Sequence, residues 1–257
     1  MNRFFIEDIK LVDNYIILDD LEQVHHLKDV LRLKPKETAA VFDRQGNEYV
    51  VLVDEIGIRS VKLEVKEKKL PDYSGIKITV ACAIPKNVKM DDIVDKLTQL
   101  GVECIIPLET ERVIVRLNKQ KKLERLKRWE KISLSALKQS QRSKFVNIHP
   151  IVEFKELVLA AKGFDLKLIP TLEGERKTLK EIFNNPSLNR DSDPFFKKKA
   201  AVPNILILIG PEGDFTPEEV VLAKGSGFLP ISLGKGVLRV DTAAIAAVSF
   251  IKLNETD

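Results

Sequence analysis

Cysteine, histidine and tryptophan are scarce in this chain of 257 residues, which contains two, three and one of them. Cys82 and Cys104 lie in apolar, strand-like runs, so they fit reduced core residues and exclude a disulfide framework. The histidines have no acid or cysteine at metal-ligand spacing, so no metal site is expected. No apolar run approaches the roughly 20 residues of a membrane span, and the N-terminus lacks the apolar core of a signal peptide. These absences predict a cytoplasmic protein without a membrane partner.

The positive charge of the chain is concentrated in one segment. The net charge is only +4, but residues 112–144 contain 12 basic and 2 acidic side chains, which gives +10. Such a focused positive field is typical of proteins that neutralise a phosphate backbone. The alternative is a solvated, lysine-rich helix face. Because acids are nearly absent here, we interpret the segment as an RNA-binding surface, with Lys121, Lys122 and Arg125 as RNA contacts.

The first 70 residues predict a small, mostly antiparallel β-barrel with one helix. Two apolar runs flank "DRQGN" at residues 43–47, which is a hairpin signal, and "SVKLEVKEK" alternates with a period of two. A helix is expected within residues 20–33. Its apolar stripe consists of Val24, Leu27, Val30 and Leu31. Residues 66–75 are charged and then broken by proline and glycine, which predicts a linker.

From residue 76 onward, apolar strands alternate with helices. The expected strands occupy residues 76–84, 102–108, 164–172, 204–210 and 228–234. Strands this apolar are buried on both faces, which favours a parallel sheet in an α/β layer. A first helix is expected to end at Gly101, and a long basic helix spans about residues 119–142. The buried stripe expected in the basic helix consists of Leu123, Leu126, Trp129, Ile132 and Ala136. Residues 185–203 show no regular pattern and predict a surface loop.

A glycine-containing turn, "GPEGDF", joins one apolar strand to the next helix. In an open parallel sheet, ligands bind beyond the carboxyl ends of the strands, where such turns lie. Thr216, Pro217 and Glu219 predict a capping box at the start of this helix. Because the helix start is already satisfied and is acidic, the turn does not favour a phosphate.

A second turn, formed by Gly234, Lys235 and Gly236, precedes a final alanine-rich helix that Asp241 or Thr242 can cap. Each turn alone can be a structural tight turn, but together, on adjacent strands, they form a cleft lined by backbone. Neither the GxGxxG spacing nor a GK[ST] ending is present. Backbone donors, an acid and no phosphate-binding lysine suit a neutral-to-cationic ligand that carries an adenine. S-adenosylmethionine fits that description.

Longer motifs resemble one protein family over essentially the whole chain. "MNRFF" and "HHLKDVLRL" resemble the PUA-like domain of the ribosomal RNA small subunit methyltransferase E family, and "RWEKISLSALKQSQR", "IGPEGDFTPEEV" and "LGKGVLRVDTAAIAA" follow in that family's order. The resemblance implies an α/β protein of the SPOUT class. It implies a small PUA-like RNA-binding β-barrel domain over residues 1–70 and a parallel-sheet methyltransferase domain with a trefoil knot over residues 71–257. The implied activity is methylation, by a homodimer, of N3 of a specific uridine of 16S rRNA in the 30S subunit, with S-adenosylmethionine as donor.

The resemblance also implies which residues bind the cofactor. Carried over by motif position, these contacts are Leu172, Gly210, Pro211, Glu212, Gly213, Leu233, Gly234 and Leu238. The chain departs from the family pattern at three positions nearby. Asp214 stands where the family usually has glycine, Gly236 where it often has arginine, and Asp241 where it has glutamate.

Arg239 is the candidate catalytic residue. It directly precedes the final helix, where a positive charge does not help the helix, so a functional role is favoured. Its guanidinium can steer an RNA phosphate or stabilise the uridine anion that develops when N3 loses its proton. The sequence identifies no general base. The further candidates for RNA contacts are Arg3, His26, Arg32 and Arg142, and for Arg142 plain surface charge is the alternative.

Two other functions are compatible with the sequence. One is an RNA-binding protein with a degenerate cofactor cleft, which calorimetry with S-adenosylmethionine separates from the enzyme. The other is a related SPOUT enzyme that methylates ribose in tRNA or 23S rRNA, although such enzymes typically lack this N-terminal barrel.

Overall fold

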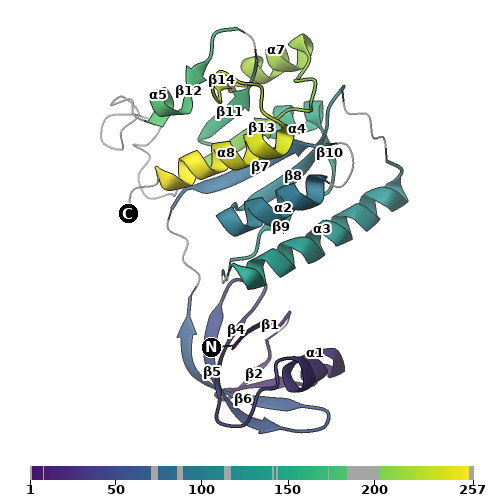
Figure 1. Cartoon of the computed structure of the whole chain (residues 1–257), viewed down its shortest axis with the longest axis vertical. Helices are drawn as coiled ribbons and strands as arrows, with labels where there is room; N and C mark the ends of the chain where they lie inside the picture. Colours follow the sequence, from purple (N-terminus) through teal and green to yellow (C-terminus); the bar gives the residue numbers. More distant parts are fainter. Residues whose placement is uncertain are drawn as a thin grey trace. The chain divides into compact units, whose positions relative to one another are not determined.

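The computed structural model describes residues 2–7, 9–70, 75–85, 89–112, 117–140, 142, 144–172, 174–183 and 203–254. The chain divides into two compact units (Figure 1). The first unit contains Met1–Asp72 together with Leu137–Phe145, and the second contains Tyr73–Ala136 and Val146–Asp257. The sequence-based division into residues 1–70 and 71–257 did not include the return of the chain to the first unit.

Aromatic packing explains why Leu137–Phe145 belongs to the first unit. The Phe145 ring lies 5.5 Å from that of Phe5, and the guanidinium of Arg44 lies 5.7 Å from the Phe145 ring centroid. Phe5 in turn packs against Phe42 at 5.6 Å. Such ring contacts add to the apolar area that the residues bury.

The first unit is built on a mostly antiparallel six-stranded sheet with the order β1-β4-β5-β6-β3-β2. Its strands are β1(Asn2–Phe5), β2(Leu11–Val12), β3(Tyr15–Leu18), β4(Thr38–Phe42), β5(Glu48–Ile56) and β6(Val61–Lys69). Only the β1–β4 pair is parallel among the pairs in the described part of this sheet. The predicted hairpin around "DRQGN" is confirmed by the antiparallel pairing of β4 with β5. Gly46 supplies the left-handed residue of its turn, with φ 83°.

The helix predicted within residues 20–33 is shorter than expected and changes type. α1(Leu21–His25) passes directly into a π-helical turn, η1(His26–Val30). The π turn holds one more residue than an α turn, and the Leu31 N–H donates to the His26 carbonyl. Leu31 therefore packs against the core, whereas Val30 is 59% exposed, so the predicted stripe is wrong at Val30.

The linker predicted at residues 66–75 begins later than expected. β6 continues to Lys69 and pairs with β5 up to the Glu48–Lys69 register, so the first part of that segment is strand. The last four residues of β6 are all charged, and this part of the strand is held by its backbone pairing with β5, which the composition of the segment does not reveal. Residues 71–74 lie outside the described residues, as do residues 184–202, which include nearly all of the predicted surface loop.

The second unit contains a sheet whose strand pairs are all parallel, as predicted from the apolar strands. The strand order is β10-β8-β7-β13-β11-β14-β12, with β9 paired to β8. Its strands are β7(Lys77–Ala83), β8(Cys104–Glu109), β9(Asn147–Ile148), β10(Val152–Glu153), β11(Leu166–Pro170), β12(Lys177–Thr178), β13(Asn204–Ile209) and β14(Leu229–Ser232). Its described helices are α2(Lys89–Leu100), α3(Lys119–Gln139), α4(Phe154–Ala160), α5(Leu179–Phe183), α7(Pro217–Gly225) and α8(Val240–Leu253), of which the last turn of α3 belongs to the first unit.

Helices cover both faces of this sheet (Figure 1). Along β7, Ile78, Val80 and Cys82 belong to the core cluster that contains α2 and α8, whereas Ala81 belongs to the cluster with α4 and α7. This alternation is the period of two that a strand buried on both faces requires. None of the described helices is long and apolar enough to cross a membrane.

Two local predictions about this unit are confirmed. Gly101 ends α2 in a left-handed conformation, with φ 72°. Cys82 is buried and Cys104 is partly buried, and both are free thiols. Burial is the main reason why the pKa of the Cys104 thiol is raised to about 11.

The basic helix α3 has the predicted apolar stripe except at one position. Trp129 is 1% exposed and donates from Nε1 to Asp91 Oδ1 at 3.1 Å, so its structural role is confirmed. Leu123, however, is 55% exposed. The first stripe residue that packs against the core is Leu126, one turn later, so the first turn of α3 lies outside the packed part.

Candidate cofactor site

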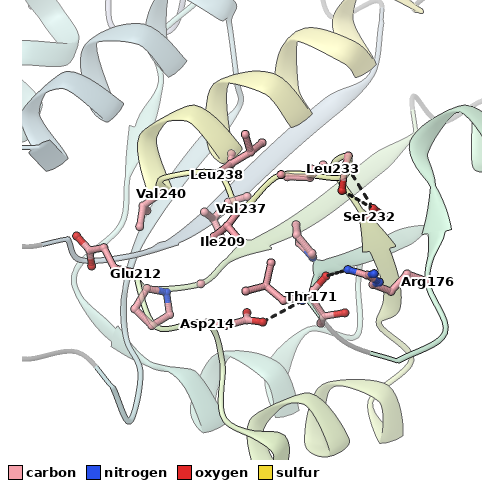
Figure 2. Close-up of a pocket in the computed structure, with 17 residues that line it drawn as sticks. Thr171, Arg176, Ile209, Glu212, Asp214, Ser232, Leu233, Val237, Leu238 and Val240 are labelled. Carbon is pink, nitrogen blue, oxygen red and sulfur yellow. Dashed lines mark hydrogen bonds between the residues drawn. The ribbon is translucent and has the colours of Figure 1, made fainter.

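A pocket lies where three neighbouring parallel strands end (Figure 2). β11 pairs with β13 on one side and with β14 on the other, so the prediction that the two glycine turns follow adjacent strands is wrong: β11 lies between their strands. Because the carboxyl ends of parallel strands meet at one edge of the sheet, the loops that follow them converge there. The pocket contains about 580 Å³ of space not filled by atoms, part of it open to solvent.

Most of the residues predicted to bind the cofactor line this pocket. The lining residues among them are Leu172, Gly210, Pro211, Glu212, Leu233, Gly234 and Leu238. Gly213 does not line it, and its carbonyl accepts from Arg112 Nη1. Whether the lining residues bind a cofactor stays a prediction.

The turn after β13 is held by the predicted capping box. The Glu219 N–H donates to Thr216 Oγ1 at 3.2 Å, and the Thr216 N–H donates to Glu219 Oε2 at 2.9 Å. The first turn of α7 is thereby satisfied without a ligand, as expected. Gly210 is required for another reason. A Cβ there would lie 3.0 Å from the buried Phe215 ring, so a larger residue would require that ring to shift by a few tenths of an ångström.

The turn after β14 leads into α8 differently from the prediction. Arg239 is the N-cap residue, without a side-chain capping bond, and α8 begins at Val240. Asp241 and Thr242 therefore lie inside the first turn, so the prediction that one of them caps the helix is wrong. Asp241 Oδ1 instead accepts from the adjacent Thr242 N–H at 2.9 Å. Gly234 has φ +125°, which only glycine adopts readily.

Two charged side chains that the sequence reasoning did not assign to the site also line the pocket. Asp214, in a left-handed conformation with φ 61°, accepts from the Leu172 N–H at 3.0 Å and from the Phe215 N–H at 2.8 Å. Arg176 Nη1 donates to the Thr171 carbonyl at 2.9 Å. The departure from family glycine at Asp214 was the one signal that could have pointed to this residue. Nothing in the sequence near Arg176 distinguishes it.

A third missed contact joins the cofactor turn to the loop after β8. The Glu111 N–H donates to Glu219 Oε1 at 3.0 Å, in addition to the Arg112–Gly213 hydrogen bond. Arg112 is the first residue of the basic segment 112–144. The turn that follows β13 is thus fastened directly to the start of that segment.

Negative charge dominates the inner wall of the pocket. Glu212 and Asp214 both line it, and Arg176 is the one cationic side chain among its described lining residues. The effect reaches Cys82 in the core: burial raises the pKa of this thiol most, and the carboxylates of Asp241 and Glu212 raise it further. A field of this sign favours a cationic ligand, such as one that carries a sulfonium or ammonium group.

Arg239 lies at the margin of the pocket. Its neighbours Leu238 and Val240 line the pocket, whereas Arg239 itself does not. Its side chain is exposed, and the described residues offer its guanidinium no hydrogen-bond or ion-pair partner. The guanidinium is therefore available to a ligand, and the catalytic role stays a prediction.

The predicted RNA contacts on α3 differ in their environment. Lys121 is exposed and Arg125 is half-buried, while Lys122 Nζ donates to Glu109 Oε2 at 2.7 Å. The ion pair lowers the net charge that Lys122 offers to a phosphate. Lys121 is consequently the most available cation of the three.

The candidates in the first unit also differ from one another. Arg3 forms an internal ion pair with Glu48 at 2.9 Å, and its side chain is only 16% exposed, so its geometry does not support an RNA contact. The remaining three, His26, Arg32 and Arg142, are exposed.

No metal centre is formed by the described residues, where no group of three or more potential ligands is found. The expectation that no acid lies at ligand spacing from a histidine was nevertheless wrong. His25 Nδ1 lies 2.6 Å from Asp29 Oδ2, one helical turn away. This exposed pair has a local structural explanation as an i,i+4 contact.

Comparisons with known proteins agree over the length of the chain. The family model of an RNA methyltransferase domain matches residues 72–252, and that of an RNA methyltransferase PUA domain matches residues 18–66. A ribosomal RNA small subunit methyltransferase E of Mesomycoplasma hyopneumoniae (strain 232) is 32% identical, with 95% of this chain and 96% of that protein covered. One from Bacillus subtilis (strain 168) is 27% identical, with 98% and 96% covered.

Solved structures show the same similarity. A crystal structure of a ribosomal RNA small subunit methyltransferase E from Neisseria gonorrhoeae, bound to S-adenosyl methionine, has a TM-score of 0.80 and 27% identity. It covers 98% of this chain and 97% of its own. A Legionella pneumophila protein solved in complex with bound cofactor SAM has a TM-score of 0.78 and 29% identity, with 98% and 96% covered.

Proposed function

This chain belongs to the RNA methyltransferase family, and from that premise we propose that it methylates N3 of a specific uridine of 16S rRNA in the small ribosomal subunit. It is an rRNA methyltransferase of the SPOUT class with S-adenosylmethionine as its cofactor. The observation that carries the proposal is the pocket at the ends of β11, β13 and β14, where the two glycine turns predicted from the sequence meet.

The residues of the pocket fit this cofactor. The carboxylate of Glu212 offers negative charge to its ammonium and sulfonium groups, and Gly210 and Gly234 let the ligand approach the backbone closely. S-adenosylmethionine supplies an electrophilic methyl group. The two turns would orient that group toward the uridine, which has to be unstacked to reach the pocket.

The protein's second task concerns the N3 proton. This proton is weakly acidic and has to leave before or during the transfer, so negative charge develops on the uridine. Arg239, exposed beside two residues that line the pocket, would stabilise this charge as a cationic hydrogen-bond donor. No described carboxylate or histidine is assigned as the general base.

The proposal extends to partners and location. The enzyme acts as a cytoplasmic homodimer on 16S rRNA within the 30S subunit. The resemblance to the family supports this assembly, and the charge of +10 in residues 112–144 supports an RNA partner. Light scattering after size-exclusion chromatography tests the dimer, and a monomeric mass at micromolar concentration would contradict it.

Methyl transfer to undermethylated 30S subunits tests the function itself. Subunits incubated with the enzyme and S-adenosylmethionine are digested to nucleosides, which mass spectrometry identifies. We expect 3-methyluridine at about one per subunit if one uridine is modified. Methylation of ribose instead would favour a SPOUT enzyme of the other class. Cofactor binding without transfer to 30S subunits or to free 16S rRNA would refute the proposed substrate.

A further inference from the structure

A single peptide unit in the pocket wall is held at both of its polar ends. The carbonyl of Thr171 accepts from Arg176 Nη1 at 2.9 Å, and the N–H of the next residue, Leu172, donates to Asp214 Oδ2 at 3.0 Å. Figure 2 shows Asp214 and Arg176 reaching Thr171 and its neighbour from opposite sides. Both hydrogen bonds are charge-assisted, which makes them stronger than bonds between neutral groups.

The Thr171–Leu172 peptide joins the loop after β11 to the turn after β13, and the peptide just before it pairs with β14. The N–H of Thr171 donates to the carbonyl of Ile231 in β14 at 3.2 Å, and Thr171 is only 6% exposed. Asp214 belongs to the turn after β13, and Arg176 lies further along the loop after β11. The orientation of the Thr171–Leu172 peptide therefore sets how the loop after β11 sits against the turn after β13, next to the backbone pairing of β11 with β14.

The backbone of Asp214 supports the same geometry. Its left-handed conformation, φ 61°, is one that aspartate tolerates better than most residues do. One carboxylate oxygen accepts from the Phe215 N–H at 2.8 Å, which leaves the other for Leu172. Each oxygen thus has its own backbone donor, so the carboxylate cannot rotate without losing a bond.

From this arrangement we infer that Asp214 and Arg176 are positioning residues of the cofactor site, acting together through the Thr171–Leu172 peptide. The inference rests on the proposed cofactor pocket but concerns its preorganisation. The two residues would raise affinity for S-adenosylmethionine by fixing the pocket wall before the ligand arrives. Neither residue needs to contact the reacting methyl group.

The test is a double-mutant cycle read out by calorimetry with S-adenosylmethionine on the full chain. Asp214→Asn keeps the size and the left-handed preference but can accept from only one of the two N–H groups. We expect it to raise the Kd about tenfold, which is the scale for one hydrogen bond to a charged group. Arg176→Gln should have a similar effect. Because both residues hold one peptide, the double variant should lose about tenfold rather than the roughly hundredfold of independent effects.

Two further measurements separate positioning from other roles. Arg176→Lys still offers one charged donor to the Thr171 carbonyl, so we expect affinity within about threefold of the wild type. A direct, bidentate contact of Arg176 with an anion would not be rescued by lysine. In methyl transfer, KM for S-adenosylmethionine should rise in the single variants while kcat at saturating cofactor stays within about twofold.

Two variants outside the pocket serve as controls for the effect of losing a charged side chain. Glu218→Gln and Arg59→Gln change exposed side chains outside the pocket and should leave the Kd unchanged. Multiplicative losses in the double variant, or wild-type affinity in both single variants, would overturn the inference. If the thermal midpoints of the variants match the wild type, misfolding does not explain a raised Kd. Absence of cofactor binding in the wild-type protein would instead refute the proposed function.

Discussion

At the scale of single residues, the backbone of Gly234 limits what the second turn tolerates. Its φ of +125° is strained for any other residue, whereas Gly236 in the same turn has no positive φ, and a Cβ added to it would meet no atom within 4 Å. Gly234→Ala should therefore cost about 1–3 kcal/mol in the native turn. We expect cofactor affinity to fall about tenfold or more in this variant, measured by calorimetry. Gly163→Ala, at a glycine outside the pocket that also has no left-handed φ and no atom near an added Cβ, is the matched control and should bind normally; equal losses in both would contradict this account.

The exposed guanidinium of Arg239 gives a second prediction at this scale. Arg239→Ala should lower single-turnover methyl transfer at saturating RNA by about 10²–10³-fold, the scale for one oriented donor to a developing anion. Cofactor affinity should change little, because Arg239 does not line the pocket. Arg239→Lys should restore part of the rate. Lys235→Ala, an exposed cation of the same loop, is the control. A wild-type rate for the alanine variant would remove Arg239 from catalysis.

The buried thiols predict how stability depends on pH. Burial raises the pKa of Cys104 from 9.0 to about 11, and that of Cys82 is raised as well. The unfolded chain loses these protons first, so their contribution is complete below pH 9 and is lost as the pH rises from 9 toward 11. Each pH unit in that window costs about 1.4 kcal/mol per thiol at most. Replacing both cysteines by alanine should flatten the loss, measured by urea unfolding. A slope equal to that of the wild type would show that other groups cause it.

At the scale of elements, we expect the basic helix α3 to bind RNA. Lys121 is exposed and Lys122 is paired with Glu109, so charge reversal at Lys121 should weaken RNA binding without disturbing an internal contact. The slope of log affinity against log salt should become shallower by about 0.7–0.9 per lost phosphate contact. Lys224→Glu, at the end of α7, is the control. Unchanged affinity and slope for Lys121→Glu would exclude this part of α3 from the RNA interface.

The elements also show where reasoning from sequence stops. The strands of the second unit were predictable because residues such as Val80, Ala81 and Cys82 form continuous apolar runs, which are typical of a strand covered on both faces. The capping box of α7 was predictable because all its parts lie within four residues. The exposure of Val30 and Leu123 was not predictable, because both residues continue the apolar spacing of a helix in the sequence. A π turn interrupts that spacing at Val30, and Leu123 lies near the end of α3 that does not pack against the core.

The candidate site also has features that the sequence predicts and features that it does not. Its glycine turns can be recognised from a few neighbouring residues of the sequence. The Asp214–Leu172 hydrogen bond, however, joins residues 42 positions apart, and the Arg112–Gly213 bond joins residues 101 positions apart. Contacts of that separation depend on which strands become neighbours, and apolar composition does not specify strand order. The trefoil knot implied by the resemblance is likewise a property of the path of the whole chain, and it stays a prediction.

At the scale of the whole molecule, the first unit is discontinuous along the chain. Residues 1–72 are synthesised well before Leu137–Phe145. During synthesis, the contacts of Phe5 and Arg44 with the Phe145 ring therefore cannot form until that residue has been added. In between, the ribosome makes β7, α2, β8 and most of α3. The first unit therefore contains all of its residues only after more than half of the polypeptide has been synthesised.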